Sequence, residues 1–309
     1  TGGAGFIGSH LVRHLVETTA DAITVFDALT YAGNEDNLAD LPADRVRLVV
    51  GDVADRAAVE AALPGHDAVV HLAAETHVDR SLLGPDVFVR TNCDGTNVVC
   101  DVARQAGVAR FVHVSTDEAY GSIETGAFTE ADPLRPPPPY SASKAGSDRI
   151  ARAYPETHGL PNHFGPRQFP EKLIPFFTTS LLLGHDVPLY GDGLHVRDWI
   201  DVRDGCAALA RVLQSGEPGE IYNIAAGNER TNRVVAEEII ALLDLDASRI
   251  EHVTDRLGHD RRYAVDAAKV RSLGWAPTRT FAESLAETVR WYQDNRAWWE
   301  PRRQRVRNR

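Results

Sequence analysis

The chain opens on TGGAGFIGSHLVRHLV (1–16), a glycine-rich turn that continues directly into an amphipathic helical pattern. Gly2, Gly5 and Gly8 follow the spacing G-x-x-G-x-x-G. Glycines let the backbone turn tightly and approach a pyrophosphate, which the N-terminus of the following helix stabilises. Glycine turns are common, however, so this interpretation depends on the residues that come next in the chain.

A carboxylate follows the glycine loop at the expected distance. The run AITVFD (22–27) ends in Asp27, about 20 residues beyond the loop. A carboxylate at this point accepts hydrogen bonds from the ribose hydroxyls of adenosine and repels a 2′-phosphate, which favours NAD over NADP. Asp52 follows VRLVVG (46–51) and is expected to meet the adenine. Together these features predict a site for NAD.

The rest of the chain predicts an α/β protein with two parts. Short apolar runs lie at 22–26, 46–50, 67–73 and 110–114, and amphipathic stretches lie between them at 8–17, 55–63 and 86–106. This alternation predicts a Rossmann-type, doubly wound parallel sheet that is covered on both faces. After about residue 170, helical patterns dominate, at 171–183, 232–245 and 281–292.

We therefore expect an NAD-binding domain over 1–170, with a return segment near 195–225. A smaller, mainly helical substrate lobe is expected over 171–309. The basic tail EPRRQRVRNR (300–309) is predicted to be a solvated, frayed end rather than an arm for nucleic acid.

Composition limits the possible partners. The 309 residues carry a net charge of −11, which argues against a nucleic-acid surface. The three cysteines are too scattered for a disulfide framework or a zinc site, and the histidines show no ligand spacing, so no metal is expected. No apolar run is long enough to cross a membrane, and no signal peptide is visible. We expect a soluble, cytoplasmic protein.

Two further motifs carry acid–base groups. STDEAYG (115–121) directly follows the apolar run RFVHV and places Asp117 beside Glu118. PYSASKAGSD (139–148) places Tyr140 and Lys144 on one face of a helix. A free phenol has a pKa near about 10, and we expect the Lys144 ammonium and the positive end of a nicotinamide to lower the pKa of Tyr140.

With these motifs in place, the chain resembles the extended short-chain dehydrogenase/reductases, which include nucleotide-sugar epimerases and dehydratases. More narrowly, it is similar over almost its whole length to the dTDP-glucose 4,6-dehydratase family. The segments that carry this resemblance are YAGN (31–34), HLAAETHVDRS (71–81), STDEAYG, YSASKAGSD, PEKLIP (170–175), PLYGDG (188–193), VRDWI (196–200), TN (231–232) and DRLGHDRRYA (255–264).

The resemblance implies site residues and a partner. A homodimer is implied, packed through helices near 86–106 and 140–154. The implied contacts to NAD come from Gly2, Gly5, Phe6, Ile7, Gly8, Asp27, Leu29, Thr30, Asp52, Val53, Leu72, Ala73, Ala74, Thr91, Ser115, Tyr140, Lys144 and His163. The implied contacts to the sugar nucleotide come from Thr76, Thr116, Asp117, Glu118, Asn162, Lys172, Leu173, Pro188, Tyr190, Arg197, Asn232, Arg256 and His259.

The chain departs from the family pattern in three places. Ala119 stands where the family has a larger aliphatic residue, and His163 replaces an asparagine that touches the cofactor. The segment ETHGLPNHFGPRQ (156–168) is shorter than its counterpart, which carries another sheet strand. Arg197 and Arg256 suit a diphosphate, because each guanidinium offers a bidentate fork.

The implied reaction explains the two carboxylates. Forming a 4-keto-6-deoxy sugar requires oxidation at C4, loss of water across C5–C6 and return of the hydride to C6. This chemistry needs a base at the C4 hydroxyl, a base at C5–H and an acid at the C6 oxygen, which Tyr140, Glu118 and Asp117 can supply. Thr116 can orient the C4 hydroxyl toward Tyr140. Adjacent residues of a strand face opposite ways, so the chain must turn just after the strand.

Three alternatives remain open. A UDP-sugar 4-epimerase shares the fold, the cofactor and the Tyr–Lys pair, but it needs no elimination and lacks the Asp–Glu pair after the strand. A 4,6-dehydratase acting on another nucleotide-glucose would share every motif. A catalytically silent NAD-binding sensor would be expected to have lost Tyr140 or Lys144, and both are present.

Overall fold

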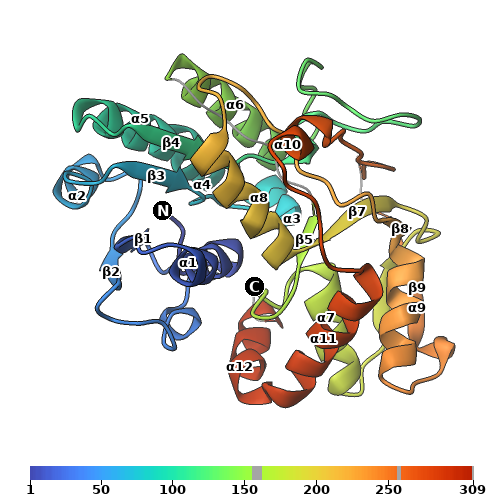
Figure 1. The fold of residues 1–309 in the computed structure, drawn as a ribbon. Coiled ribbons are helices and arrows are strands. Elements are labelled where there is room, and N and C mark those ends of the chain that lie inside the picture. The colour runs from blue at the N-terminus through green and yellow to red at the C-terminus, as the bar shows by residue number, and fades with distance from the viewer. Residues whose placement is uncertain (155–161, 256–258, 308–309) are drawn as a thin grey trace.

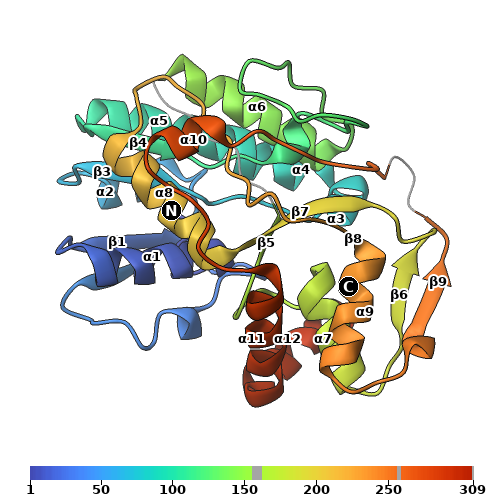
Figure 2. The same ribbon diagram turned by 45° about the vertical axis from the view of Figure 1, so that its right-hand side comes forward.

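The computed structural model describes residues 1–154, 162–255 and 259–307. Figures 1 and 2 show the elements from α1 to α6 on one side of the molecule, with α7, α9, α11 and α12 grouped on the other. The two groups differ in composition, because the first contains the parallel strands β1 to β4 and the second is mainly helical.

The first sheet is parallel and passes through the start of the chain. β1 (Ile23–Asp27) pairs with β2 (Val46–Val50), and β3 (Ala68–His71) pairs with β4 (Arg110–His113). The first two residues lie between these pairs. The Gly2 N–H donates to the Phe26 carbonyl at 2.9 Å, and the Leu72 N–H donates to the Thr1 carbonyl at 3.2 Å. These bonds join the four strands, which occupy the four apolar runs of the sequence.

Helices cover both faces of this sheet. On one face α1 (Phe6–Thr18) packs against α8 (Val202–Ser215), side by side in Figure 1. On the other face lie α2 (Arg56–Ala62) and α5 (Gly95–Gln105), whose Val59 and Val99 belong to one apolar cluster with strand residues. Strands buried on both faces give continuous apolar runs. The structure thus confirms the predicted doubly wound α/β sheet.

The long helix predicted over 86–106 is interrupted. It consists of α4 (Pro85–Phe88), a π-helical turn (Val89–Asp94) and α5. The turn carries Asn92, whose amide donates to the Glu75 carbonyl at 3.1 Å and to the Ser143 hydroxyl at 2.8 Å. Single π-helical turns often mark functional sites, and this one fastens α6 to the loop after β3.

The second group is built around its own apolar core. α7 (Leu173–Leu182), α9 (Asn232–Leu242) and α11 (Phe281–Asp294) match the three helical patterns of the sequence and enclose a cluster that includes Phe177 and Ile239. The remaining strands are β5 (Asn162–Phe164) parallel to β7 (Val196–Asp201), β8 (Glu229–Thr231) antiparallel to β7, and β6 (Val187–Tyr190) parallel to β9 (Ile250–Val253). The remaining helical elements are α3 (Val78–Leu83), α6 (Pro139–Ala153), α10 (Ala268–Ser272) and short 3₁₀ turns at Glu35–Asn37, Asp117–Ala119 and Ala247–Arg249.

The prediction of a frayed C-terminal end is wrong for the described part of the tail. Residues Arg296–Arg307 form α12, in which the Trp299 side chain is fully buried. Arg303 donates to the Ser180 hydroxyl at 2.8 Å, and its guanidinium lies 3.9 Å from the Phe176 ring centroid. Arg303 thus anchors this helix to α7 through its hydrogen bond and its stacked guanidinium. Among the described residues, no helix is long and apolar enough to cross a membrane.

Candidate active site

A cavity of about 1160 Å³ is lined by residues of both groups of elements. Nearly all predicted site residues line it; of those described, Leu29 alone does not. Arg256 lies outside the described residues. Pockets for one small ligand usually measure about 300–1,000 Å³, so this cavity has room for a dinucleotide and a second ligand together.

The glycine loop forms an anion site at one end of the cavity. Gly2 has a φ of +68°, a conformation that favours glycine. A Cβ at Gly8 would overlap the Gly2 carbonyl oxygen, so the tight turn requires glycine there. α1 begins after Gly5 and has no side-chain cap, which leaves its first N–H groups available to a ligand. The loop therefore fits the pyrophosphate of a dinucleotide.

Asp27 lies beside this loop with both oxygens supported. Its carboxylate accepts the Ala4 N–H at 3.0 Å and the Leu29 N–H at 2.9 Å. Each oxygen keeps a lone pair for a ribose hydroxyl. Leu29 contributes its backbone, while its side chain packs against an apolar cluster near Val25. Asp52 lines the cavity, but one of its oxygens pairs with Arg90 at 2.7 Å and the other accepts the Ala54 N–H at 2.9 Å, so both already have partners.

The departure at His163 has a structural counterpart. His163 lies on β5 and lines the cavity, and its imidazole packs against the backbone of α8 at Gly205. A Cβ at Gly205 would overlap His163 Nε2, so the glycine makes room for the larger side chain. The other predicted cofactor residues on the cavity wall are Phe6, Ile7, Thr30, Val53, Leu72, Ala73, Ala74, Thr91 and Ser115.

The chain turns just after β4. Such a turn is required if the neighbouring carboxylates Asp117 and Glu118 are to reach the same substrate. The Thr116 hydroxyl accepts the Glu118 N–H at 3.3 Å and begins the 3₁₀ turn Asp117–Ala119. Asp117 is buried, and both carboxylates line the cavity. The small Ala119, buried within this turn, occupies the place of the larger family residue.

The two carboxylates differ in their tendency to hold a proton. Burial, and then the neighbouring Glu118, raise the pKa of Asp117 to about 8. Burial also raises the pKa of Glu118, but Lys172 and Arg197 oppose that shift. The Ser141 hydroxyl donates to Glu118 at 3.2 Å. Burial and the neighbouring carboxylate thus favour the protonated form of Asp117.

Tyr140 and Lys144 both lie on α6, and burial shifts the pKa of each side chain. Burial, followed by Glu118, raises the pKa of Tyr140 well above its ordinary value. Lys144 donates to the Val114 carbonyl at 2.7 Å, and burial lowers its pKa to about 8. Desolvation therefore outweighs any lowering of the pKa of Tyr140 by Lys144, and the lowering expected from Lys144 together with a nicotinamide stays a prediction.

The other end of the cavity carries the predicted sugar-nucleotide contacts. Lys172 and Leu173 lie at the start of α7, and the Lys172 ammonium donates to the Thr76 carbonyl at 2.9 Å. Asn162 Nδ2 and Asn232 Oδ1 are buried with no hydrogen-bond partner among the described residues. Buried amide atoms rarely stay unpaired, which indicates polar contact with a ligand here. Pro188 and Tyr190 of β6 complete this part of the wall.

Arg197 faces the carboxylates as well as the substrate end. Its guanidinium donates to the carbonyls of Val196 at 2.7 Å and Asp260 at 3.0 Å, and it lies 4.1 Å from the Tyr263 ring centroid. It also lowers the pKa of Asp117. Arg197 thus balances the buried negative charge and keeps further N–H groups for a ligand.

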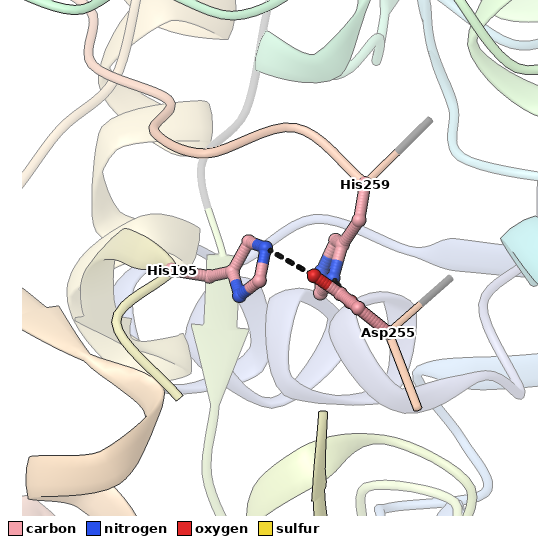
Figure 3. Close-up of side chains that lie close together, drawn as sticks. All are labelled: His195, Asp255 and His259. Carbon is pink, nitrogen blue, oxygen red and sulfur yellow. Dashed lines mark hydrogen bonds and ion pairs between the residues drawn. The ribbon is translucent and has the colours of Figure 1, made fainter. Parts of the chain in front are cut away.

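His259 lines the cavity and belongs to a small cluster with His195 and Asp255, which Figure 3 shows. His195 Nε2 lies 3.2 Å from Asp255, and His259 Nδ1 lies 2.7 Å from the other Asp255 oxygen. The two imidazoles stack with their centroids 3.6 Å apart. Each side chain is among those that could ligate a metal, but the stacked rings are arranged to share the carboxylate. The cluster fixes the orientation of His259.

Several polar residues of the cavity wall were not singled out from the sequence. Tyr31 donates to Glu171 at 3.1 Å, and the Arg80 guanidinium lies 3.9 Å from the Tyr31 ring centroid. Glu75, buried two residues beyond Ala73, lies 3.7 Å from Arg80. Glu75 follows the carboxyl end of β3 as Asp117 follows that of β4, which is the signal that could have identified it.

Comparisons with known proteins agree with this site. The sequence profile of the family described as GDP-mannose 4,6 dehydratase matches residues 1–288. The dTDP-glucose 4,6-dehydratase of Streptomyces antibioticus is 52% identical over 99% of this chain and 95% of its own length. The structure of DesIV, a dTDP-glucose 4,6-dehydratase from Streptomyces venezuelae with NAD and TYD bound, has a TM-score of 0.95 and 51% identity over 97% of this chain and 98% of that one.

A UDP-glucose 4-epimerase of Thermotoga maritima, solved with UDP-glucose, has a TM-score of 0.87 but only 28% identity over 95% of this chain and 97% of that one. The fold is thus shared across enzymes with different reactions, while the sequence favours one group. The chain belongs to the GDP-mannose 4,6 dehydratase family and over nearly its whole length is similar to dTDP-glucose 4,6-dehydratases.

Proposed function

We propose that this chain is an NAD-dependent dTDP-glucose 4,6-dehydratase, which converts dTDP-glucose to dTDP-4-keto-6-deoxyglucose. The observation that carries the proposal is the Asp117–Glu118 pair that lines the cavity with Tyr140, in which Asp117 is buried and Glu118 half-buried. Burial of Asp117 raises its pKa, as an acid for the C6 oxygen requires. An enzyme that only inverted C4 would need neither a carboxylic acid nor a second base. The similarity to known dehydratases over nearly the whole chain supports the same conclusion.

Each step of the reaction has its own residue. Tyr140 takes the proton of the C4 hydroxyl, which Thr116 orients toward it. The chemistry that NAD supplies when bound is reversible hydride transfer to and from the sugar. Glu118 removes the C5 proton, which the C4 ketone has made acidic, and Asp117 protonates the departing C6 oxygen. Lys144 and Arg197 stabilise the negative charge of the groups around them.

We also propose a division of labour within the chain. Residues 1–170, with the return segment near 195–225, would hold NAD, and residues 171–309 would mainly hold the sugar nucleotide. The glycine loop and Asp27 support the first assignment, and the unpaired amide atoms of Asn162 and Asn232 support a polar ligand at the other end. Because the sugar nucleotide and NAD are both metabolites of the cytoplasm, we propose that location.

The simplest test is to incubate the purified protein with dTDP-glucose and follow the sugar nucleotide by mass spectrometry. Dehydration removes one water, whereas epimerisation leaves the mass unchanged. We expect dehydration, and UDP-glucose and GDP-mannose in parallel reactions report the nucleotide preference. An unchanged mass with galactose formed from UDP-glucose would establish the epimerase instead.

A substrate with fluoride at C6 separates the two carboxylates. Fluoride needs little help to leave, so Asp117→Asn should lose activity on dTDP-glucose by about 10²–10⁴-fold and recover much of it on the fluoride substrate. Glu118→Gln should not recover, because C5–H removal is still required. Rescue of Glu118→Gln but not Asp117→Asn would reverse the two roles.

A further inference from the structure

The proposed reaction leaves two side chains in a changed protonation state after each turnover. Tyr140 gains the proton of the C4 hydroxyl, and Asp117 loses one when the C6 hydroxyl leaves as water. Glu118 is balanced, because it takes a proton from C5 and C5 is later protonated again. The sugar loses only water overall, so one proton must pass from Tyr140 to Asp117 before the next turnover.

We propose that the Thr116 hydroxyl carries this proton directly from Tyr140 to Asp117, so that both groups are restored without exchange with solvent. The inference rests on the proposed function. In the transfer, the Tyr140 O–H proton moves to Thr116 Oγ while the Thr116 proton moves to the Asp117 carboxylate. The products are a phenolate and a carboxylic acid, and the threonine ends as a hydroxyl.

The contacts of Thr116 suit this role. A hydroxyl has one donor and two acceptor positions. Thr116 Oγ accepts the Glu118 N–H at 3.3 Å and donates to Asp117 Oδ1 at 3.4 Å. Its side chain also interacts with the Tyr140 phenol, where it opposes the rise in the pKa of Tyr140. Thr116, Asp117 and Tyr140 are all buried. The 3.4 Å bond is longer than the optimum of about 2.7 Å and has to shorten for transfer, as catalytic hydrogen bonds do when substrate binds.

The neighbouring polar groups have other partners. Lys144 donates to the Val114 carbonyl at 2.7 Å, and Ser141 donates to Glu118 at 3.2 Å. Within the described part of the site, Thr116 is therefore the hydroxyl that interacts with both ends of the transfer. Charge sets the direction, because the positive nicotinamide of the oxidised cofactor favours the phenolate, while burial raises the pKa of Asp117 and favours its protonated form.

The test compares wild type, Thr116→Val and Thr116→Ser by rapid mixing of holoenzyme with dTDP-glucose in weak buffer, with a pH-indicator dye. Valine keeps the volume and removes the hydroxyl, whereas serine keeps the hydroxyl. We expect Thr116→Val to complete a first turnover and then slow at least tenfold, with a proton transient that the wild type lacks. Imidazole buffer should speed these later turnovers, and serine should restore the wild-type pattern.

Thr116→Val could instead slow the first turnover and the later turnovers by the same factor, with no effect of imidazole. That result would show that Thr116 only orients the sugar. Thr116→Ser behaving like Thr116→Val would also overturn the proposal. If the wild-type enzyme forms no dehydrated product, the proposed function itself is refuted. That outcome is distinct from a failure of the proton transfer through Thr116. Burial of Thr116 makes folding a concern, and the amplitude of the first turnover counts the folded sites in each variant.

Discussion

Asp27 illustrates how one carboxylate can have both a structural and a selective role. It accepts backbone N–H groups from Ala4 in the glycine loop and from Leu29, and it lines the cavity. Asp27→Asn replaces one acceptor oxygen by a donor and removes the charge. We expect NAD⁺ affinity to fall by about tenfold or more, since a hydrogen bond to a charged group contributes about 1.5–3 kcal/mol, and discrimination against NADP⁺ to shrink.

Titration of the cofactor-free protein with NAD⁺ and NADP⁺ by calorimetry measures both effects. Asp52→Asn is the matched control, because Asp52 lines the same cavity but pairs with Arg90. Its effect should be smaller. Equal affinity of wild type for the two cofactors would remove Asp27 from this role.

At the same scale, the sequence predicts which residues meet but not their protonation. The spacing of Tyr140 and Lys144 places them on one face of α6, as the structure shows. Their pKa values depend on burial, which comes from elements distant in sequence, such as the Val114 carbonyl that holds Lys144. Spacing carries no information about desolvation, which raises the pKa of Tyr140 in this structure.

Among the elements, α1 is held in part by a buried histidine. His10 Nδ1 lies 3.0 Å from the Phe6 carbonyl, and burial lowers the pKa of His10 to about 4. The unfolded chain, with a pKa near about 6.5, binds a proton below that pH while the folded protein does not, so stability is full above pH 6.5 and is lost as pH falls toward 4.

His10→Gln removes this term and can still donate to the carbonyl. Relative to its own stability at pH 7.5, the variant should lose about 2 kcal/mol less than wild type on transfer to pH 5, as measured by urea unfolding. Parallel stability curves for the two proteins between these pH values would contradict the assignment.

The C-terminal helix α12 tests whether an arginine-rich segment can stabilise the fold. Arg303 is buried against α7, with its hydrogen bond to Ser180 and its contact with Phe176. Arg303→Ala should lower the free energy of unfolding by about 1–3 kcal/mol. Arg296→Ala is the control, because Arg296 lies exposed in a pair with Glu300 on the same helix and should change little. Equal effects in chemical denaturation would show that Arg303 contributes no more than a surface ion pair.

The elements best predicted from sequence are those with a single physical origin. Parallel strands between two layers of helices are mainly apolar, so β1 to β4 are visible as four runs, although β2 is only partly buried. The π-helical turn (Val89–Asp94) and α12 are different. The π-helical turn depends on the hydrogen bonds of Asn92 to α6 and to the loop after β3. The helix α12 depends on the burial of Trp299 and Arg303 against the rest of the fold. Neither dependence is local in sequence.

The whole molecule presents an apolar stretch that suits the proposed homodimer. Leu82, Leu83, Val87 and Val89 are exposed next to or within the interrupted helix at 85–105. Val89→Arg would place an unpaired charge in such an interface and should yield monomers. Val50→Arg is the control, because Val50 is comparably exposed, 61% against 51% for Val89, but lies on β2 away from these helices.

Light scattering coupled to size-exclusion chromatography measures both variants against wild type. We expect a dimer for wild type and for Val50→Arg. A dimeric Val89→Arg protein, or a monomeric wild type, would contradict the proposed interface.

The close packing of His163 on Gly205 also constrains the order in which substitutions can accumulate. A side chain at 205 meets the buried imidazole, so Gly205→Ala should be among the poorly tolerated changes in a library of single variants, although Gly205 does not line the cavity. His163→Asn shortens the side chain and should make the same alanine acceptable. The two positions then form an epistatic pair, in which the histidine can be acquired only by a chain that already carries the glycine.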